Sequence, residues 1–194
     1  VYMNKLILAS GSPRRKEILA REGYSFDIIK SEKEDPFDKF CPPEKFSVRC
    51  AFSKAMDVYS RADKTCVVLG ADTVVSIDGI LLGKPKDRED AEKMLRTLSG
   101  REHAVTTGYA IFTEGFSETG SVTTKVLFEN LSDETINAYL GSGLWQGKAG
   151  AYGIQDGFPL VKSYEGDYDN VVGLPIAEIG RTLSLLLKQG REEK

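Results

Sequence analysis

The stretch LILASGSPRRKEIL, residues 6–19, decides how the fold begins. Its apolar run Leu6–Ala9 predicts a buried strand, because a short run of apolar residues before a turn is typical of strands covered on both faces. Ser12 suits the N-cap of a following helix, and Pro13 suits the first turn of that helix. A strand, a tight turn and a helix are therefore expected to open the chain.

Three cations follow at the start of this helix, at Arg14, Arg15 and Lys16. A helix N-terminus normally favours acidic side chains, by about 0.3–1 kcal/mol per charge, because the helix dipole is positive there. A bound anion would resolve this conflict, since free backbone N–H groups, guanidinium groups and the hydroxyl of Ser10 could all donate to it. The alternative is a set of solvated charges on a surface helix, balanced by nearby glutamates such as Glu17.

The composition favours one globular domain over residues 1–194, since 41% of the residues are hydrophobic and 28% are charged. The net charge is −3 and the sequence pI is about 5.4. This acidic balance argues against a general nucleic-acid binder, which carries a basic face. A local basic pocket in an acidic chain instead fits a small anionic ligand.

No segment approaches the length of a membrane span, and no signal-peptide pattern opens the sequence. The three cysteines, Cys41, Cys50 and Cys66, form no CxxC pair, and His103 is the single histidine of the sequence. A zinc site is therefore not expected. We expect a cytoplasmic protein with free thiols and no membrane attachment.

Apolar periodicity predicts alternating strands and helices along the chain. Strands are expected at 6–9, 24–30, 66–77, 80–83, 104–113 and 121–129, and short strands with glycine turns over 151–172. Helices are expected from Pro13, over 46–61, over 87–100 with Asp87 at the N-cap, from Ser132, and over 174–187. Asp78 and Gly79 predict a hairpin turn, and residues 188–194 a frayed tail. Together these elements predict a single α/β or α+β domain around a twisted mixed sheet.

Asp72 interrupts the apolar segment LGADTVV, residues 69–75. A carboxylate in such a strand is either held by neighbouring amides in a structural role or faces a functional site. In the second case Asp72 is a candidate metal ligand or general base. The hydroxyl of Thr73 lies next to it in the sequence.

Two lysines and a glycine-rich stretch complete the local candidates. Lys54 flanks the apolar stripe of its helix, and Lys84 precedes Pro85 just after the hairpin. Either lysine alone is more typical of a solvated side chain than of a ligand. The stretch 147–157 is dense in glycine, which indicates plain surface turns or close backbone approach to a ligand, and its Gln155 amide can both donate and accept.

Several short motifs occur in order between residue 8 and residue 175, namely LASGSPRRKEIL, GADTVV, GKP, LSGREH, KAGAYGIQ and VVGLP. The ordered set resembles the Maf family of nucleotide pyrophosphatases over nearly the whole chain. The resemblance implies a mixed α/β fold similar to inosine triphosphate pyrophosphatases, with a cleft beside a long curved sheet. It also implies hydrolysis of nucleoside triphosphates to monophosphate and pyrophosphate, a divalent metal (Mg²⁺, Mn²⁺ or Co²⁺) and a homodimer.

The resemblance also implies roles for individual residues. The phosphate loop of the family falls on Ser10, Arg14 and Arg15. The catalytic base falls on Asp72, and the lysines of the family fall on Lys54 and Lys84. An acidic pair falls on Glu34 and Asp35, and Glu34 joins Asp72 as a candidate metal ligand.

One branch of the family resembles this chain at Arg15, Thr73 and Gln155, and that branch is associated with dTTP and UTP. The branch that prefers 7-methyl-GTP differs at the last two positions. The resemblance therefore favours a pyrimidine triphosphate and a role in cleaning the nucleotide pool. Two rivals stay open: a nucleotide-binding regulator of cell division or septum formation without turnover, and a pyrophosphatase directed at non-standard purine triphosphates.

One departure from the family pattern lies beside the glycine-rich turn. The family usually has Asp-Lys-Ala-Gly there, whereas Gly147 precedes Lys148 in this chain. If the missing Asp orients Lys148 or a metal-bound water, its loss weakens catalysis or changes specificity, and a neutral loop difference is the alternative. Trp145 and the end of the last helix are candidates for a dimer face.

Overall fold

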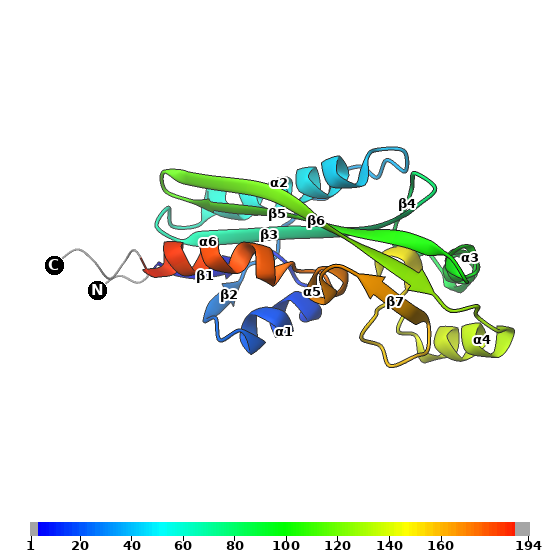
Figure 1. Cartoon of the computed structure of the whole chain (residues 1–194). Helices are drawn as coiled ribbons and strands as arrows, with labels where there is room; N and C mark the ends of the chain where they lie inside the picture. The colour runs from blue at the N-terminus through cyan, green and yellow to red at the C-terminus, as the bar shows by residue number, and fades with distance from the viewer. Residues whose placement is uncertain (1–3, 189–194) are drawn as a thin grey trace.

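The computed structural model describes residues 4–188 of the chain. Within these residues, seven strands form one sheet in the order β2-β1-β3-β5-β6-β7, with β4 paired to β3 (Figure 1). The strands are β1 (Leu6–Leu8), β2 (Phe26–Ile28), β3 (Val67–Ile77), β4 (Ile80–Leu82), β5 (Glu102–Thr113), β6 (Phe116–Phe128) and β7 (Val161–Glu165). Strand β1 pairs in parallel with β2 and with β3, and the remaining pairs are antiparallel. The expected mixed α/β fold around a long mixed sheet is confirmed.

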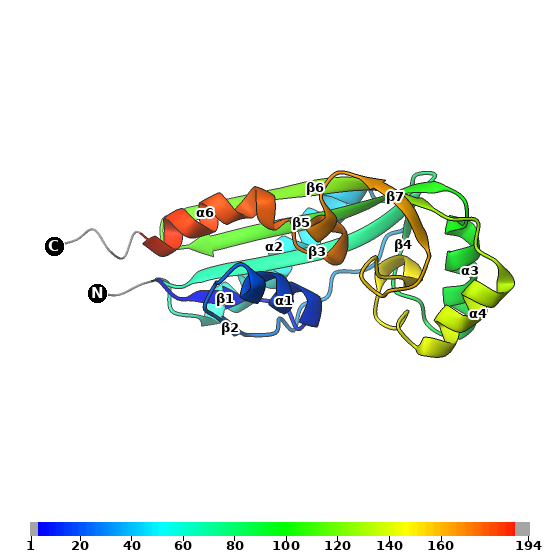
Figure 2. The same ribbon diagram turned by 60° about the horizontal axis from the view of Figure 1, so that its bottom comes forward.

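Six α-helices and a short 3₁₀ turn, Ala149–Ala151, accompany the sheet in the described part of the chain. The helices are α1 (Pro13–Arg21), α2 (Pro43–Arg61), α3 (Arg88–Leu98), α4 (Asp133–Ser142), α5 (Tyr168–Val172) and α6 (Ile176–Lys188). Figures 1 and 2 show α2 on one face of the sheet and α1, α5 and α6 on the other, with α3 and α4 at one end. None of the helices in residues 4–188 combines the length and apolarity that a membrane crossing requires.

The two faces of β3 pack against different helices because side chains alternate along a strand. Leu69 and Ala71 lie in a core cluster with residues of α1 and α6, whereas Val68 lies in a cluster with residues of α2. This alternation continues past the core, so Asp72 belongs to the α2 face and Thr73 to the α1 face. The position of each polar side chain is therefore set by the apolar residues that precede it.

Two glycines let α2 lie directly on the sheet. A Cβ atom at Gly70 would stand 2.5 Å from the backbone oxygen of Ala51, and one at Gly108 would stand 2.2 Å from the carbonyl carbon of Ser47. Any larger residue at either position would force the helix away from β3 and β5. The close contact brings Lys54 of α2 next to Asp72.

Several local predictions from the sequence are confirmed. Asp78 and Gly79 both have positive φ, 53° and 74°, as a primed hairpin turn requires. Asp87 caps α3, and its side chain accepts a hydrogen bond from the N–H of Asp90 at 2.8 Å. Ser132 likewise caps α4 by accepting from the N–H of Thr135. These caps satisfy N–H groups that have no partner inside the helix.

The expectation of short strands over residues 151–172 is wrong in part. This region contains one strand, β7, and the helix α5. The side chain of Asp167 accepts hydrogen bonds from the N–H groups of Asp169 and Asn170, which starts a helix where a strand was expected. The expected tail lies outside the described residues, except for Lys188, which ends α6.

Ser12 occupies the expected N-cap position of α1, although its side chain makes no capping hydrogen bond. The expectation for Trp145 needs correction. Trp145 cannot form a dimer face, because it is only 9% exposed and lies in the core cluster near α3 and α4. Its indole N–H donates to the carbonyl of Leu140 at 3.0 Å, so the polar end of the ring is also satisfied inside the molecule.

Candidate active site

The candidate site lies at an open edge of β3. Strand β1 pairs with β3 as far as Leu69, and β4 pairs with β3 from Val75 onwards. Between these two partners, the same edge of β3 has no strand neighbour among the described residues, and Asp72 and Thr73 lie in this gap. The loop that follows β1 leads into the N-terminus of α1 there. Ligands of α/β proteins commonly bind at such carboxyl ends of parallel strands.

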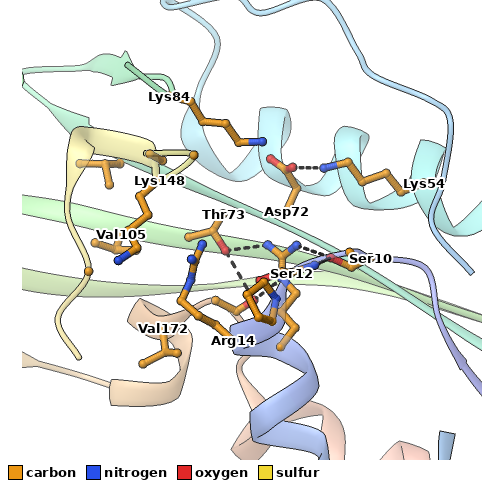
Figure 3. Close-up of a pocket in the computed structure, with 18 of the residues that line it drawn as sticks. Ser10, Ser12, Arg14, Lys54, Asp72, Thr73, Lys84, Val105, Lys148 and Val172 are labelled. Carbon is orange, nitrogen blue, oxygen red and sulfur yellow. Dashed lines mark hydrogen bonds and ion pairs between the residues drawn. The ribbon is translucent and has the colours of Figure 1, made fainter. Parts of the chain in front are cut away.

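A cleft of about 480 Å³ occupies this gap (Figure 3). Two carboxylates are found among the described residues that line it, Glu34 and Asp72. Seven cationic side chains line it as well, namely Arg14, Arg15, Lys30, Lys33, Lys54, Lys84 and Lys148. A chain with a net charge of −3 thus concentrates positive charge in one cleft. Such a cleft attracts anions of high charge.

Asp72 lies between two lysines. It forms an ion pair with Lys54 of α2, and the two side chains are 18% and 22% exposed. Lys84 extends toward the same carboxylate from the other side in Figure 3. The backbone carbonyl of Gly83 accepts from the N–H of Gly150 at 3.1 Å, which holds the segment with Lys84 against the glycine-rich loop.

Ser10 and Arg14 shape the start of α1. The Ser10 hydroxyl oxygen accepts from the N–H of Ser12 at 3.2 Å and from Nη1 of Arg15 at 3.0 Å. With both acceptor positions used, the hydroxyl hydrogen of Ser10 is left to donate to a ligand. Arg14 reaches into the cleft (Figure 3). The helix N-terminus therefore presents a donor and a cation to the same space.

Arg15 is held differently from Arg14. Arg15 is 9% exposed, and its guanidinium donates to the carbonyl of Gly173 at 2.7 Å and to Oγ1 of Thr73 at 3.1 Å, besides its bond to Ser10. Burial lowers the pKa of Arg15 to about 10, and the nearby charge of Asp72 opposes that shift. Arg15 thus stays cationic at neutral pH and ties α1, β3 and the end of α5 together.

Thr73 lies at the centre of this hydroxyl network. Its Oγ1 lies 2.8 Å from Oγ1 of Thr107 on β5 and accepts from Arg15. Thr107 in turn donates to the backbone carbonyl of Asn170 in α5. The orientation of the Thr73 side chain is therefore set by three elements of the fold.

The wall opposite Lys54 contains a second lysine–aspartate pair. Nζ of Lys148 lies 2.5 and 2.6 Å from the two carboxylate oxygens of Asp156, and these side chains are 10% and 5% exposed. The hydroxyl of Tyr139 also donates to Asp156, at 2.6 Å. Gln155 lines the cleft next to this pair. The glycine-rich stretch therefore forms one wall of the site.

The two residues of the expected acidic pair separate in the structure. Glu34 lines the cleft, whereas Asp35 accepts from Oγ of Ser53 at 3.3 Å and lies 3.9 Å from Nε of Arg49 on α2. Across residues 4–188, no group of three or more histidine, cysteine, aspartate or glutamate side chains gathers as a ready-made metal centre. A metal bound in the cleft would therefore need ligands from the substrate as well.

Comparison with known proteins agrees with this geometry, because the family model of Maf-like proteins matches residues 5–186. The chain belongs to the Maf family. A dTTP/UTP pyrophosphatase of Thermococcus gammatolerans is 50% identical over 181 residues, which cover 93% of this chain and 96% of the relative. A dTTP/UTP pyrophosphatase of Alkaliphilus metalliredigens is 45% identical over 184 residues, 93% of this chain and 95% of the relative. Among solved structures, a nucleoside-triphosphatase / dITP/XTP pyrophosphatase of Mycobacterium abscessus is similar with a TM-score of 0.45, at 16% identity over 96% of each chain.

The departure of this Maf chain at Gly147 has a structural counterpart. Gly147 adopts a φ of 69°, and a Cβ atom there would meet no atom within 4 Å. Lys148 nevertheless has a carboxylate partner, because Asp156 binds it directly. A side chain at position 147 is therefore not needed to hold this lysine in place.

Sequence reasoning missed several residues of this Maf cleft. Lys30 and Lys33 line it, and Lys30 follows β2, whose carboxyl end lies next to that of β1. The parallel arrangement of β1 and β2 could have indicated this, because the carboxyl ends of parallel strands lie at the same edge of a sheet. Asp156 carried no signal, because its contact with Lys148 depends on how the glycine-rich loop folds back. Those two residues are only eight positions apart, and neither strand nor helix periodicity links them.

Proposed function

We propose that this Maf protein hydrolyses dTTP and UTP to the nucleoside monophosphate and pyrophosphate, and so removes triphosphates from the nucleotide pool. The observation that carries the proposal is the charge of the cleft, with seven cations and two carboxylates among the described residues that line it. A nucleoside triphosphate carries several negative charges and fits a cleft of about 480 Å³. The names of the relatives from Thermococcus and Alkaliphilus support the same substrate class.

The phosphates bind at the N-terminus of α1 in this proposal. Arg14, the hydroxyl of Ser10 and the free backbone N–H groups donate to phosphate oxygens. Arg15 supports this loop by holding Ser10, while its charge adds to the potential of the cleft. The bound anion thus accounts for Arg14 and Arg15 at the start of α1, whereas Lys16 is exposed and does not line the cleft.

The chemical step is attack of water on the α-phosphorus, in line with the departing pyrophosphate. The water oxygen forms the new P–O bond, the bond to the bridging oxygen breaks, and Asp72 accepts the proton of the water. Lys54 and Lys84 lie beside Asp72 and neutralise charge that grows on the phosphate oxygens. Asp72 is exposed enough to reach solvent, at 18%, as a residue that contacts water requires.

We propose that a divalent metal accompanies the triphosphate, held by Asp72 and Glu34. Two carboxylates in the cleft fit a Mg²⁺-like ion, which is commonly bound by one or two carboxylates together with substrate phosphates. When bound, such an ion neutralises phosphate charge and makes a coordinated water more acidic. The candidate ions are Mg²⁺, Mn²⁺ and Co²⁺.

The base binds near Thr73, Arg15 and Gln155 in this proposal. Gln155 lies on the glycine-rich wall, and Thr73 and Arg15 lie on the α1 side of β3. Thr73 and Arg15 are held by hydrogen bonds within the protein, which keeps this end of the cleft rigid before a base arrives. Such preorganisation favours selection of one base shape over another.

Pyrophosphate release from canonical and modified nucleoside triphosphates, with Mg²⁺, Mn²⁺ or Co²⁺ added, tests the proposal. We expect dTTP and UTP to exceed all purine triphosphates in kcat/KM. Higher activity on inosine or xanthosine triphosphate would favour the purine-directed rival. Tight nucleotide binding without release of pyrophosphate would favour the regulator of cell division.

We further propose a homodimer in a reducing compartment, as the cytoplasm is. The three cysteines of the sequence are free and buried, which agrees with a reducing environment. Leu185 of α6 is 55% exposed and offers apolar area for a partner copy, in line with the expectation for the end of this helix. Light scattering on the purified protein measures its mass and decides whether it is a monomer or a dimer.

A further inference from the structure

We propose that Asp156 is a positioning residue for base selection: it fixes the side-chain amide of Gln155 so that the amide oxygen faces the base. The proposal rests on the proposed pyrimidine substrate and adds a residue to its specificity. Asp156 does not line the cleft, so it acts through Gln155 and not by touching the substrate.

The key contact joins Nε2 of Gln155 to Oδ1 of Asp156 at 3.3 Å. A carboxylate only accepts hydrogen bonds, so the NH₂ end of the amide must be the end that faces Asp156. The oxygen end, Oε1, then becomes the end available to a ligand in the cleft. Without a fixed acceptor beside it, a glutamine amide can turn over and present either end.

Asp156 is well suited to impose this orientation because it is itself immobilised. Both of its oxygens bind Nζ of Lys148, and Oδ2 also accepts from the hydroxyl of Tyr139. Its side chain is 5% exposed, so water does not compete for these contacts. Gln155, by contrast, is exposed and adjusts to the carboxylate.

The resulting pattern matches thymine and uracil. Both bases have an N–H donor at N3, whereas cytosine has an acceptor at N3. An amide oxygen that faces N3 therefore binds dTTP and UTP and opposes CTP, since it would place two acceptors against each other. Two acceptors placed against each other lose a hydrogen bond, which weakens binding by about tenfold.

Gly153 leaves the space that the side chains of Gln155 and Asp156 occupy when they contact each other. A Cβ atom there would stand 2.6 Å from Nε2 of Gln155 and 2.8 Å from each carboxylate oxygen of Asp156. Substitution by alanine would therefore displace both side chains while leaving both present. The displaced atoms are the ends of side chains, so the backbone conformation can stay unchanged.

The experiment compares UTP with CTP by the ratio of their kcat/KM values, in wild type and in Asp156→Asn and Gly153→Ala. We expect the UTP preference to fall by about tenfold in each variant, because neither presents Gln155 with a fixed acceptor. Gln155→Leu should lose the same preference, and adding Asp156→Asn to it should change the ratio no further. Tyr139→Phe is the matched control, since it removes a contact of Asp156 but neither the Lys148 nor the Gln155 contact, and the ratio should hold.

The outcomes separate this inference from the proposed function. If the two variants lower kcat/KM for UTP and CTP alike, Asp156 has only a structural role and the inference is overturned. Should Asp156→Asn fail to fold, Gly153→Ala decides alone. Calorimetric binding of UTP and CTP without added metal gives the same ratio independently of turnover. A wild type that discriminates in binding but releases no pyrophosphate would reject the hydrolase and leave the role of Asp156 intact.

Discussion

The two lysine–aspartate pairs of the cleft differ in how far water reaches them. Lys54 and Asp72 are 22% and 18% exposed, whereas Lys148 and Asp156 are 10% and 5% exposed. Figure 3 shows Lys54 and Lys148 on opposite sides of the cleft, and the first pair belongs to α2 and β3 whereas the second belongs to the glycine-rich loop. The same two residue types are thus placed in two different environments.

The difference in exposure indicates different roles. A pair that water can reach can separate when a charged substrate arrives, so its carboxylate and ammonium become available for chemistry. A pair enclosed by protein separates only at a high cost, because each partner would remain as a buried, uncompensated charge. We therefore propose that the more accessible pair, Lys54 and Asp72, serves the reaction, and that the enclosed pair holds the wall of the cleft.

Among the substitutions that test the two pairs, Asp72→Asn should have the largest effect, and that effect should be on kcat. We expect kcat to fall by about 10³-fold, because the variant loses the carboxylate that we propose as the acceptor of the proton of water. Its free energy of unfolding should change by less than about 1 kcal/mol, since a partly exposed pair contributes little to stability. Asp27→Asn is the matched control, because Asp27 pairs with Lys5 on the surface, away from the cleft. Full turnover by Asp72→Asn would remove Asp72 from the reaction.

Lys148→Met should show the opposite pattern to Asp72→Asn, because its main effect should be on the free energy of unfolding. Asp156 would keep its burial and lose its cation, which costs about 3 kcal/mol in the free energy of unfolding. Urea denaturation measures this loss, and Lys54→Met should lose less than about 1 kcal/mol in the same assay. Combining Lys148→Met with Asp156→Leu should restore much of the stability, because no buried charge then remains. Equal losses for the two lysine variants would show that the pairs are equivalent.

His103 makes the stability of the folded protein depend on pH, and it lies behind the glycine-rich wall of the cleft. It is buried, and its Nε2 lies 2.7 Å from the hydroxyl of Tyr152, which lines the cleft. Burial lowers the pKa of His103 from 6.5 to about 4. Between these values the unfolded chain binds a proton that the folded chain does not, so stability is full above pH 6.5 and is lost as the pH falls. From pH 7.5 to pH 5 we expect a loss of about 2 kcal/mol from this group.

Denaturation curves of wild type and His103→Gln across this range isolate the histidine. Carboxylates contribute equally to both proteins, so the difference between the two curves is due to His103. The difference should shrink by about 2 kcal/mol as the pH falls from 7.5 to 5. A difference that does not change with pH would mean that His103 keeps its ordinary pKa.

The fold was predictable where the chain follows local rules. The Asp78-Gly79 turn, the Asp87 cap and the long apolar run of β3 each depend on residues close together in the sequence. The helix α5 was missed because its start depends on a single capping residue, Asp167, inside a glycine-rich region. Trp145 was misplaced because burial of a lone aromatic residue is decided by packing with distant elements.

The site was predictable only as far as motifs and charge allow. Asp72 and Arg14 stand out in the sequence because each is a charged residue in an unusual local setting, whereas Lys54 is assigned only by the resemblance to the Maf family. The sequence could not distinguish Arg14 from Arg15, since the burial of Arg15 comes from contacts with Thr73 and Gly173 far along the chain. Glu34 and Asp35 could not be separated either, because only the folded loop turns Asp35 toward α2.

Gly147→Asp should have the smallest effect, and it tests whether the enclosed pair is complete. Position 147 has open space around it, so the new carboxylate fits, at a cost of about 1 kcal/mol in stability for a φ of 69°. Both carboxylate oxygens of Asp156 already bind Nζ of Lys148. We therefore expect kcat/KM for UTP to stay within about threefold of wild type. A gain of about tenfold or more would show that Lys148 requires a second carboxylate, and that the glycine weakens this member of the family. The unchanged rate that we expect would instead mean that one enclosed aspartate is sufficient to hold the wall, which leaves position 147 free to vary.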